Sequence, residues 1–145
     1  MPLRQLGVFI DNKPGSLSKA IAILDNSRIK ILALSIVDTG EFGLLRLILD
    51  DPEQAIKIFE DANFTLGKSR INTEVTSIII DEKNNISRVT EILGNNNINI
   101  DYAYLSPIQK DGRKALIIGV KDTEKTEKIL KENDIGFLSL DDLDK

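Results

Sequence analysis

The apolar positions in the first half of the chain change their spacing from one stretch to the next. Leu3 to Ile10 is a mostly apolar run of the length of a β-strand. From Leu17 to about Asn26 the apolar residues recur at the three- and four-residue spacing of an amphipathic helix. The pattern then predicts strands at Ile29 to Val37 and Phe42 to Leu49, a helix with Pro52 in its first turn, and a strand from Asn63 to Gly67. The predicted order is βαββαβ.

The second half of the chain shows the same order of elements. The predicted elements are a strand at Val75 to Asp81, a helix at Ile86 to Leu93, strands at Ile98 to Leu105 and Lys114 to Val120 around a turn at Pro107 to Gly112, a helix at Asp122 to Glu132 and a strand at Ile135 to Leu140. The order βαββαβ is thus predicted twice.

The two halves also align residue by residue at one constant offset, which indicates an internal repeat. Leu17 lies over Ile86, and 86 minus 17 is 69. The further pairs at this offset are Leu24 with Leu93 and Ile29 with Ile98. We therefore expect two domains, at residues 1–72 and 73–145.

The stretch between the two copies is not typical of a flexible linker. Thr65 to Glu74 contains no Pro and a single Gly. We expect the last strand of the first copy to run almost directly into the first strand of the second.

The stretch Asp11 to Leu17 joins the first strand to the first helix and carries unusual chemistry for a turn. Pro14 restricts its own backbone, and Gly15 lets the backbone approach another group closely. Ser16 is a candidate cap for the helix, whose first N–H groups would attract a carboxylate or a phosphate. A plain strand-to-helix turn is the alternative interpretation.

Composition excludes several classes of chemistry. The chain of 145 residues has no cysteine and no histidine, so disulfides, thiolate metal sites and Ser-His-Asp triads are ruled out. A formal net charge of −4 disfavours a broad nucleic-acid surface. No apolar run approaches the roughly 18 residues of a membrane span, and the start lacks the core of a signal peptide. We expect a soluble cytoplasmic protein that binds neither nucleic acid nor membrane.

With the repeat in place, three stretches of the first copy resemble tandem ACT-domain proteins of the free-standing, two-copy type. They are Val8 to Leu17, Ile29 to Ser35 and Phe42 to Arg46. The resemblance covers almost the whole chain. It implies an α+β fold of two ferredoxin-like βαββαβ ACT domains with antiparallel sheets, paired side by side into one eight-stranded sheet.

The resemblance also implies where a ligand would bind. In the family, an Asn two residues before the Pro holds the amino or carboxyl group of the ligand, which here is Asn12. The Gly after the Pro lets the backbone approach, which here is Gly15. Ligands lie at the seam between one copy's loop and the other copy's second strand. Carried over, the seam strands are Leu32 to Val37 and Asp101 to Leu105.

The second copy departs from this pattern. Its loop, Asp81 to Ile86, lacks the Pro-Gly pair and is one residue shorter. Glu82 falls where Asn12 lies, and neither Asn84 nor Asn85 can copy Pro14 or Gly15. We therefore expect one ligand site per chain, on the first loop.

The candidate ligand-binding residues come from this loop and the two seam strands. They are Asp11, Asn12, Lys13, Pro14, Gly15, Ser16, Leu17, Leu34, Ser35, Tyr102 and Tyr104. Each has a structural alternative. Asn12 could form a local Asx turn, Asp11 could face water, Ser35 could be a strand surface residue, and the two tyrosines could be ordinary interface residues.

These observations lead to a regulatory hypothesis and two alternatives. The first is a non-catalytic, allosteric sensor that binds a free amino acid or a similar small metabolite at the seam, without a cofactor or a metal. The second is a regulatory or structural subunit that acts on an amino-acid metabolic enzyme through protein contacts, without its own ligand. An enzyme of the same architecture is the third, but no base and nucleophile pair can be named. Exposed sheet edges favour a homodimer.

Overall fold

The computed structural model describes residues 3–66, 73–139 and 142. These residues form two compact units, one within Arg4–Thr73 and one that comprises Leu3 and residues within Glu74–Lys145. We call them the first unit and the second unit, and each is described by itself. The predicted direct continuation from strand to strand runs through residues 67–72, which lie outside the described residues.

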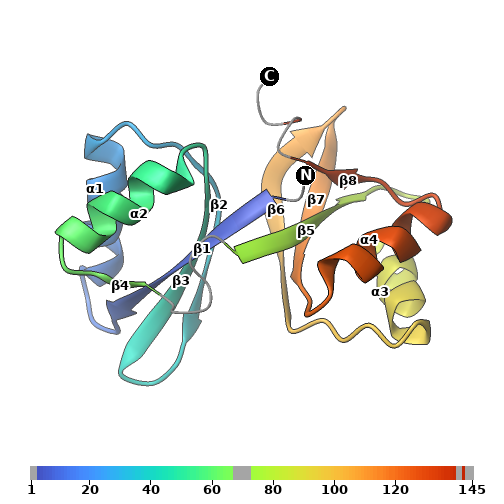
Figure 1. Cartoon of the computed structure of the whole chain (residues 1–145), viewed down its shortest axis with the longest axis horizontal. Helices are drawn as coiled ribbons and strands as arrows, with labels where there is room; N and C mark the ends of the chain where they lie inside the picture. Colours follow the sequence, from blue (N-terminus) through green and yellow to red (C-terminus); the bar gives the residue numbers. More distant parts are fainter. Residues whose placement is uncertain (1–2, 67–72, 140–141, 143–145) are drawn as a thin grey trace. The chain divides into compact units, whose positions relative to one another are not determined.

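The first unit is an antiparallel sheet with both of its helices packed on one face (Figure 1). Its elements are β1 (Leu3–Asp11), α1 (Ser16–Asn26), β2 (Ile31–Asp38), β3 (Phe42–Leu49), α2 (Pro52–Asp61) and β4 (Thr65–Leu66). The strands lie in the order β4-β1-β3-β2, and every pairing within the unit is antiparallel. Because β1 and β3 are central, β2 lies at one edge of this sheet.

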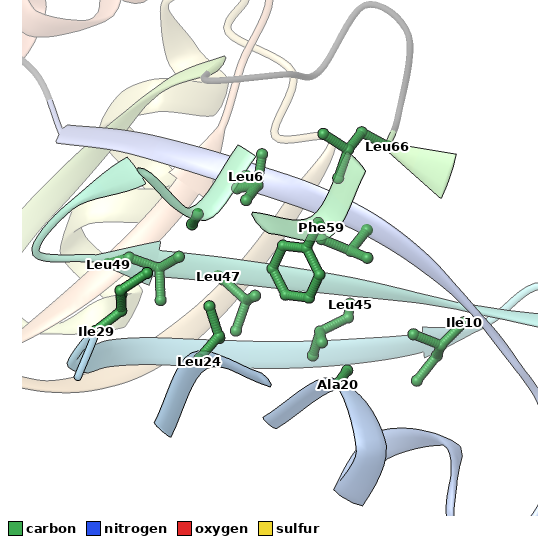
Figure 2. Close-up of a cluster of buried hydrophobic side chains, with 12 residues drawn as sticks. Leu6, Ile10, Ala20, Leu24, Ile29, Leu45, Leu47, Leu49, Phe59 and Leu66 are labelled. Atoms are coloured by element: carbon green, nitrogen blue, oxygen red, sulfur yellow. The ribbon is translucent and has the colours of Figure 1, made fainter. Parts of the chain in front are cut away.

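The core of the first unit follows from the alternation of side chains along its strands (Figure 2). Residues paired across antiparallel strands share a face, so Leu6 opposite Leu47 and Val8 opposite Leu45 point toward the helices. Leu24 of α1 and Phe59 of α2 meet them in the cluster shown in Figure 2. All of these side chains are at most 1% exposed, and each contributes about 1.5–3 kcal/mol to folding. This packing holds the ends of β1 and α1 in place.

The second unit repeats the architecture. Its elements are β5 (Thr73–Ile80), α3 (Ile86–Asn95), β6 (Tyr102–Lys110), β7 (Arg113–Gly119), α4 (Thr123–Glu132) and β8 (Phe137–Leu138). The strands lie in the order β8-β5-β7-β6, again antiparallel, and both helices contribute to one core. The α+β fold with two βαββαβ units is thereby confirmed. The joining of the two sheets at a seam stays a prediction.

Both second strands begin later than the sequence pattern predicts. After α1, Arg28 takes a φ of 60°, and the Ile29 N–H donates to the Leu24 carbonyl at 3.0 Å. This left-handed closure of the helix keeps Ile29 out of the strand, which begins at Ile31. In the second unit, Asn97 has a φ of 60°, the Ile98 N–H donates to the Leu93 carbonyl, and the strand begins at Tyr102.

The turn predicted at Pro107 to Gly112 is shorter in the structure. Strand β6 continues to Lys110, and Asp111 and Gly112 alone make the turn, with φ values of 54° and 77°. Pro107 lies at an irregularity in the pairing of β6 with β7. A bulged edge strand accommodates proline because the strand does not need its missing N–H.

Among the described residues, none of the helices is long and apolar enough to cross a bilayer.

Candidate ligand-binding site

The loop from β1 to α1 ends in a helix start without a side-chain cap. The N-cap residue is Gly15, with φ 87° and ψ −12°, and helix α1 begins at Ser16. The expected cap by Ser16 is therefore wrong, because Ser16 already lies inside the helix and its N–H donates to the Lys13 carbonyl at 3.2 Å. The left-handed φ explains the glycine, since side-chain-bearing residues rarely adopt it.

This helix start differs from the other three. Asp51, Asn85 and Asp122 each accept a backbone N–H at the start of α2, α3 and α4. Within the described part of the chain, the N–H groups of Leu17 and Ser18 have no such acceptor. The first turn of α1 therefore presents two open N–H donors, which favour a negatively charged group nearby.

Asn12 is held by the turn between β2 and β3. Its Nδ2 donates to Asp38 Oδ1 at 3.1 Å and to the Gly40 carbonyl at 2.9 Å, and its backbone N–H donates to the Glu41 carbonyl at 3.0 Å. Both hydrogens of the amide nitrogen are thus used in tying the loop to the hairpin. Only the Oδ1 of Asn12 could serve a ligand, as an acceptor for an amino group.

A pocket of about 540 Å³ opens beside this loop, within the first unit. Three of the predicted residues line it together, namely Asp11, Lys13 and Ser16. The Lys13 Nζ lies 3.6 Å from Asp11 Oδ2, and both side chains are well exposed. The other lining residues are Phe9, Ile10, Lys19, Phe42, Ala62, Asn63, Phe64 and Thr65.

The pocket combines charge with apolar walls. Lys13 and Lys19 supply two cations beside one carboxylate, Asp11. The ring of Phe64 packs against Phe59, since the two rings meet edge to face with centroids 5.3 Å apart. A small molecule with charged and apolar parts fits such a lining, and the volume is in the range of ligand pockets.

The predicted residues of β2 do not line this pocket. Leu34 pairs with Leu47 and shares the helix-facing side of the sheet, while Ser35 pairs with Arg46 on the opposite side. Leu17 lines a separate hollow of about 980 Å³ between α1 and β2. Pro14 shapes the loop without lining the pocket.

The two predicted tyrosines lie on β6, in the second unit. They share one face by the alternation of the strand, opposite Gly119 and Ile117 of β7. The ring of Tyr102 lies over Gly119, where an added Cβ would overlap the ring. Tyr102 therefore has a structural role, because its ring covers this glycine.

The pocket residues from α1 and from the turn after α2 do not stand out in the sequence. Lys19 is one of many exposed charges, and Asn63 looks like an ordinary turn residue at φ 66°. The repeat marks these two positions, because the second copy has the polar residues Arg88 and Asp134 there.

Among residues 3–66, 73–139 and 142, no three acidic side chains gather as a metal site.

The whole chain, residues 1–145, matches the family described as ACT domain pair. The chain belongs to the ACT domain pair family. This confirms the resemblance drawn from the loop and the repeat. No curated protein matches the sequence.

Solved structures of other proteins share the fold of this ACT domain pair. The crystal structure of protein BT0572 from Bacteroides thetaiotaomicron matches with a TM-score of 0.84 at 28% identity, over 99% of this chain and 96% of that one. The regulatory subunit of aspartate kinase from Thermus thermophilus, in a ligand-free form, matches with a TM-score of 0.60 at 15% identity, over 90% and 91%. That from Thermus flavus matches with a TM-score of 0.56 at 14% identity, over 89% and 90%. At these identities, the two Thermus structures support the fold alone.

Proposed function

We propose that this ACT domain pair is a non-catalytic regulatory sensor that binds a free amino acid at the loop from β1 to α1. The observation that carries the proposal is the pocket beside this loop, where two lysines and one carboxylate stand over apolar walls. A free amino acid carries a carboxylate, an ammonium group and a side chain, and this lining has a partner for each.

The loop supplies the charges that distinguish an amino acid from an apolar metabolite. Lys13 and Lys19 attract the α-carboxylate. Asp11 is an acceptor for the α-ammonium group. A sensor acts by binding one of two conformations more tightly, so that the ligand shifts their populations.

Titration calorimetry against the twenty amino acids tests the proposal. We expect one amino acid or a small group of similar ones to bind. The double variant Asp11→Asn, Lys13→Gln should bind at least about tenfold more weakly, since each lost charge-assisted contact contributes about 1.5–3 kcal/mol. Lys83→Gln, in the corresponding loop of the second unit, is the matched control and should bind as the wild type does. If none of the twenty amino acids gives a binding signal while circular dichroism shows that the protein is folded, the proposal is refuted.

A second candidate function is a regulatory subunit that acts through protein contacts without its own ligand. Strand β2 favours it, because Leu34 and Ile36 are 43% and 47% exposed at the edge of the sheet. The aspartate kinase regulatory subunits of the two Thermus species suggest an enzyme of amino-acid metabolism as the partner. Co-purification from native extract, with Ile36→Lys as the disrupting variant, separates this candidate from the sensor. A partner that remains bound to the variant argues against β2 as the contact.

A further inference from the structure

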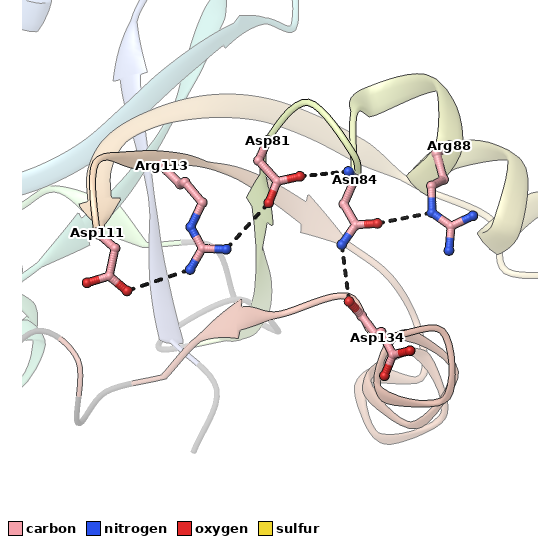
Figure 3. A network of polar contacts seen from close by, with 6 residues as sticks. All are labelled: Asp81, Asn84, Arg88, Asp111, Arg113 and Asp134. Carbon is pink, nitrogen blue, oxygen red and sulfur yellow. Dashed lines mark hydrogen bonds and ion pairs between the residues drawn. The ribbon is translucent and has the colours of Figure 1, made fainter.

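Asn84 of the second unit is buried inside a polar network (Figure 3). Asn84 is only 7% exposed, although it lies in a loop. The Nδ2 of Asn84 donates to the Asp134 carbonyl at 3.1 Å, and the Oδ1 accepts from the Arg88 Nε at 3.0 Å. The carboxamide therefore bridges the first turn of α3 and the turn after α4, with one donor and one acceptor in use.

The partners of Asn84 have counterparts in the first unit. Arg88 corresponds to Lys19, since 88 minus 19 is the same 69 that relates the two helices. Asp134 corresponds to Asn63 at an offset of 71, and both have a left-handed φ, 56° and 66°. The backbone agrees: Asp134 N–H donates to the Lys131 carbonyl as Asn63 N–H does to that of Glu60.

The first unit has no side chain where Asn84 stands. At the offset of 69 that relates the two helices, Asn84 corresponds to Gly15. An added Cβ on Gly15 would meet no atom within 4 Å. The counterparts of both of its partners, Lys19 and Asn63, line the open pocket instead. The second unit thus fills with its own carboxamide a place that the first unit leaves open.

We infer that the head group of an α-amino acid occupies this place in the first unit, between Lys19 and the backbone carbonyl of Asn63. The inference rests on the proposed function and specifies where the ligand's head group lies. As the amide of Asn84 does in the second unit, the ligand presents an acceptor, its carboxylate, to the cation of α1. It presents a donor, its ammonium group, to the carbonyl of the turn.

The walls select an apolar side chain for this amino acid. Phe42 lies opposite Asp11 in the pairing of β1 with β3. Its counterpart beside Asp81 is Arg113, which forms ion pairs with Asp81 at 3.4 Å and with Asp111 at 3.6 Å. The second unit is therefore polar at the position where the first has an aromatic ring. Together with Phe9 and Phe64, Phe42 gives the pocket an apolar lining for the ligand side chain.

Two variants test the location of the head group. Lys19→Gln removes the cation, and Lys19→Arg restores it with the residue type of the second unit. A loop graft replaces residues 12–16 with the sequence Glu-Lys-Asn-Asn of residues 82–85, which brings the plugging carboxamide into the first unit. Each protein is titrated with the twenty amino acids and with the α-amides of those that bind, while backbone amide signals are followed by NMR.

Apolar amino acids should shift the amide signals of Lys19 and Asn63 in the wild type. Lys19→Gln should weaken binding about 10- to 100-fold, Lys19→Arg should weaken it far less, and the α-amides should bind more weakly than the acids. The graft, if folded, should not bind. If it does not fold, the two Lys19 variants decide the matter.

The failures of the two proposals differ. An amino acid that binds with shifts outside the pocket, or with equal affinity to the wild type and Lys19→Gln, overturns the head-group position and leaves the sensor intact. The absence of any shift with all twenty amino acids refutes the sensor, and the head-group position falls with it.

Discussion

Replacing Asn84 by alanine should destabilise the second unit by about 2 kcal/mol. The substitution removes two hydrogen bonds, to the Asp134 carbonyl at 3.1 Å and from the Arg88 Nε at 3.0 Å. A typical intramolecular hydrogen bond contributes about 1 kcal/mol net, and one to a charged group about 1.5–3 kcal/mol. Arg88 and Asp134 are both exposed, so water can replace the lost partner and the sum stays near the lower end.

Urea unfolding of the wild type and of Asn84→Ala measures this difference, as a shift of the transition at an unchanged slope. Glu82→Ala is the matched control, since Glu82 is an exposed residue of the same loop, and it should change the stability by less than about 0.5 kcal/mol. A loss below about 0.5 kcal/mol for Asn84→Ala would refute the reasoning that its carboxamide holds α3 to the turn after α4.

Three further predictions concern backbone geometry and pH. Gly15→Val should lower the stability by about 1–2 kcal/mol in thermal unfolding, because valine is strained at a φ of 87° although the space is open. Gly119→Ala should cost about 1–3 kcal/mol, with a change in tyrosine fluorescence, because its Cβ meets the ring of Tyr102. The N–H of Asn84 holds the pKa of Asp81 below its ordinary value, so Asp81→Asn should destabilise at pH 7, and the difference should narrow as the pH falls below about 4.

The sign of the pH prediction follows from the direction of the pKa shift. A carboxyl group whose pKa is lower in the folded state stabilises the fold while it is ionised, and this contribution is lost as acid protonates it. Unfolding curves for wild type and Asp81→Asn at several pH values measure the effect. A gap between them that stays constant from pH 7 to pH 3 would contradict it.

The order of elements could be predicted from the sequence because its signals are local. Alternation with a period of two and spacing with a period of 3.6 report which face of a short segment is buried, whatever the rest of the chain does. The repeat at 69 residues added the two-unit organisation in the same way. The strands β2 and β6 begin later than predicted, because Arg28 and Asn97 end the preceding helices in a left-handed conformation that the apolar pattern does not report.

Of the predicted ligand-binding residues, only some of those in the loop from β1 to α1 line the pocket. Asp11, Lys13 and Ser16 do line the pocket, but Asn12 donates both amide hydrogens to residues 26 and 28 positions away. No local pattern reports that pairing. Lys19 and Asn63 do not stand out in the sequence for the same reason, since they come to line one pocket only after α1 and α2 have packed on the sheet.

The sequence by itself determined the family, the repeat and the loop that differs between the two copies. Each of these is written in residues adjacent along the chain. The tertiary structure alone decided which polar groups remain open. A hydrogen bond joins whatever the fold brings within about 3 Å, so Asn84 is satisfied by Asp134, which lies 50 residues away, while Gly15 leaves the matching place in the first unit unfilled.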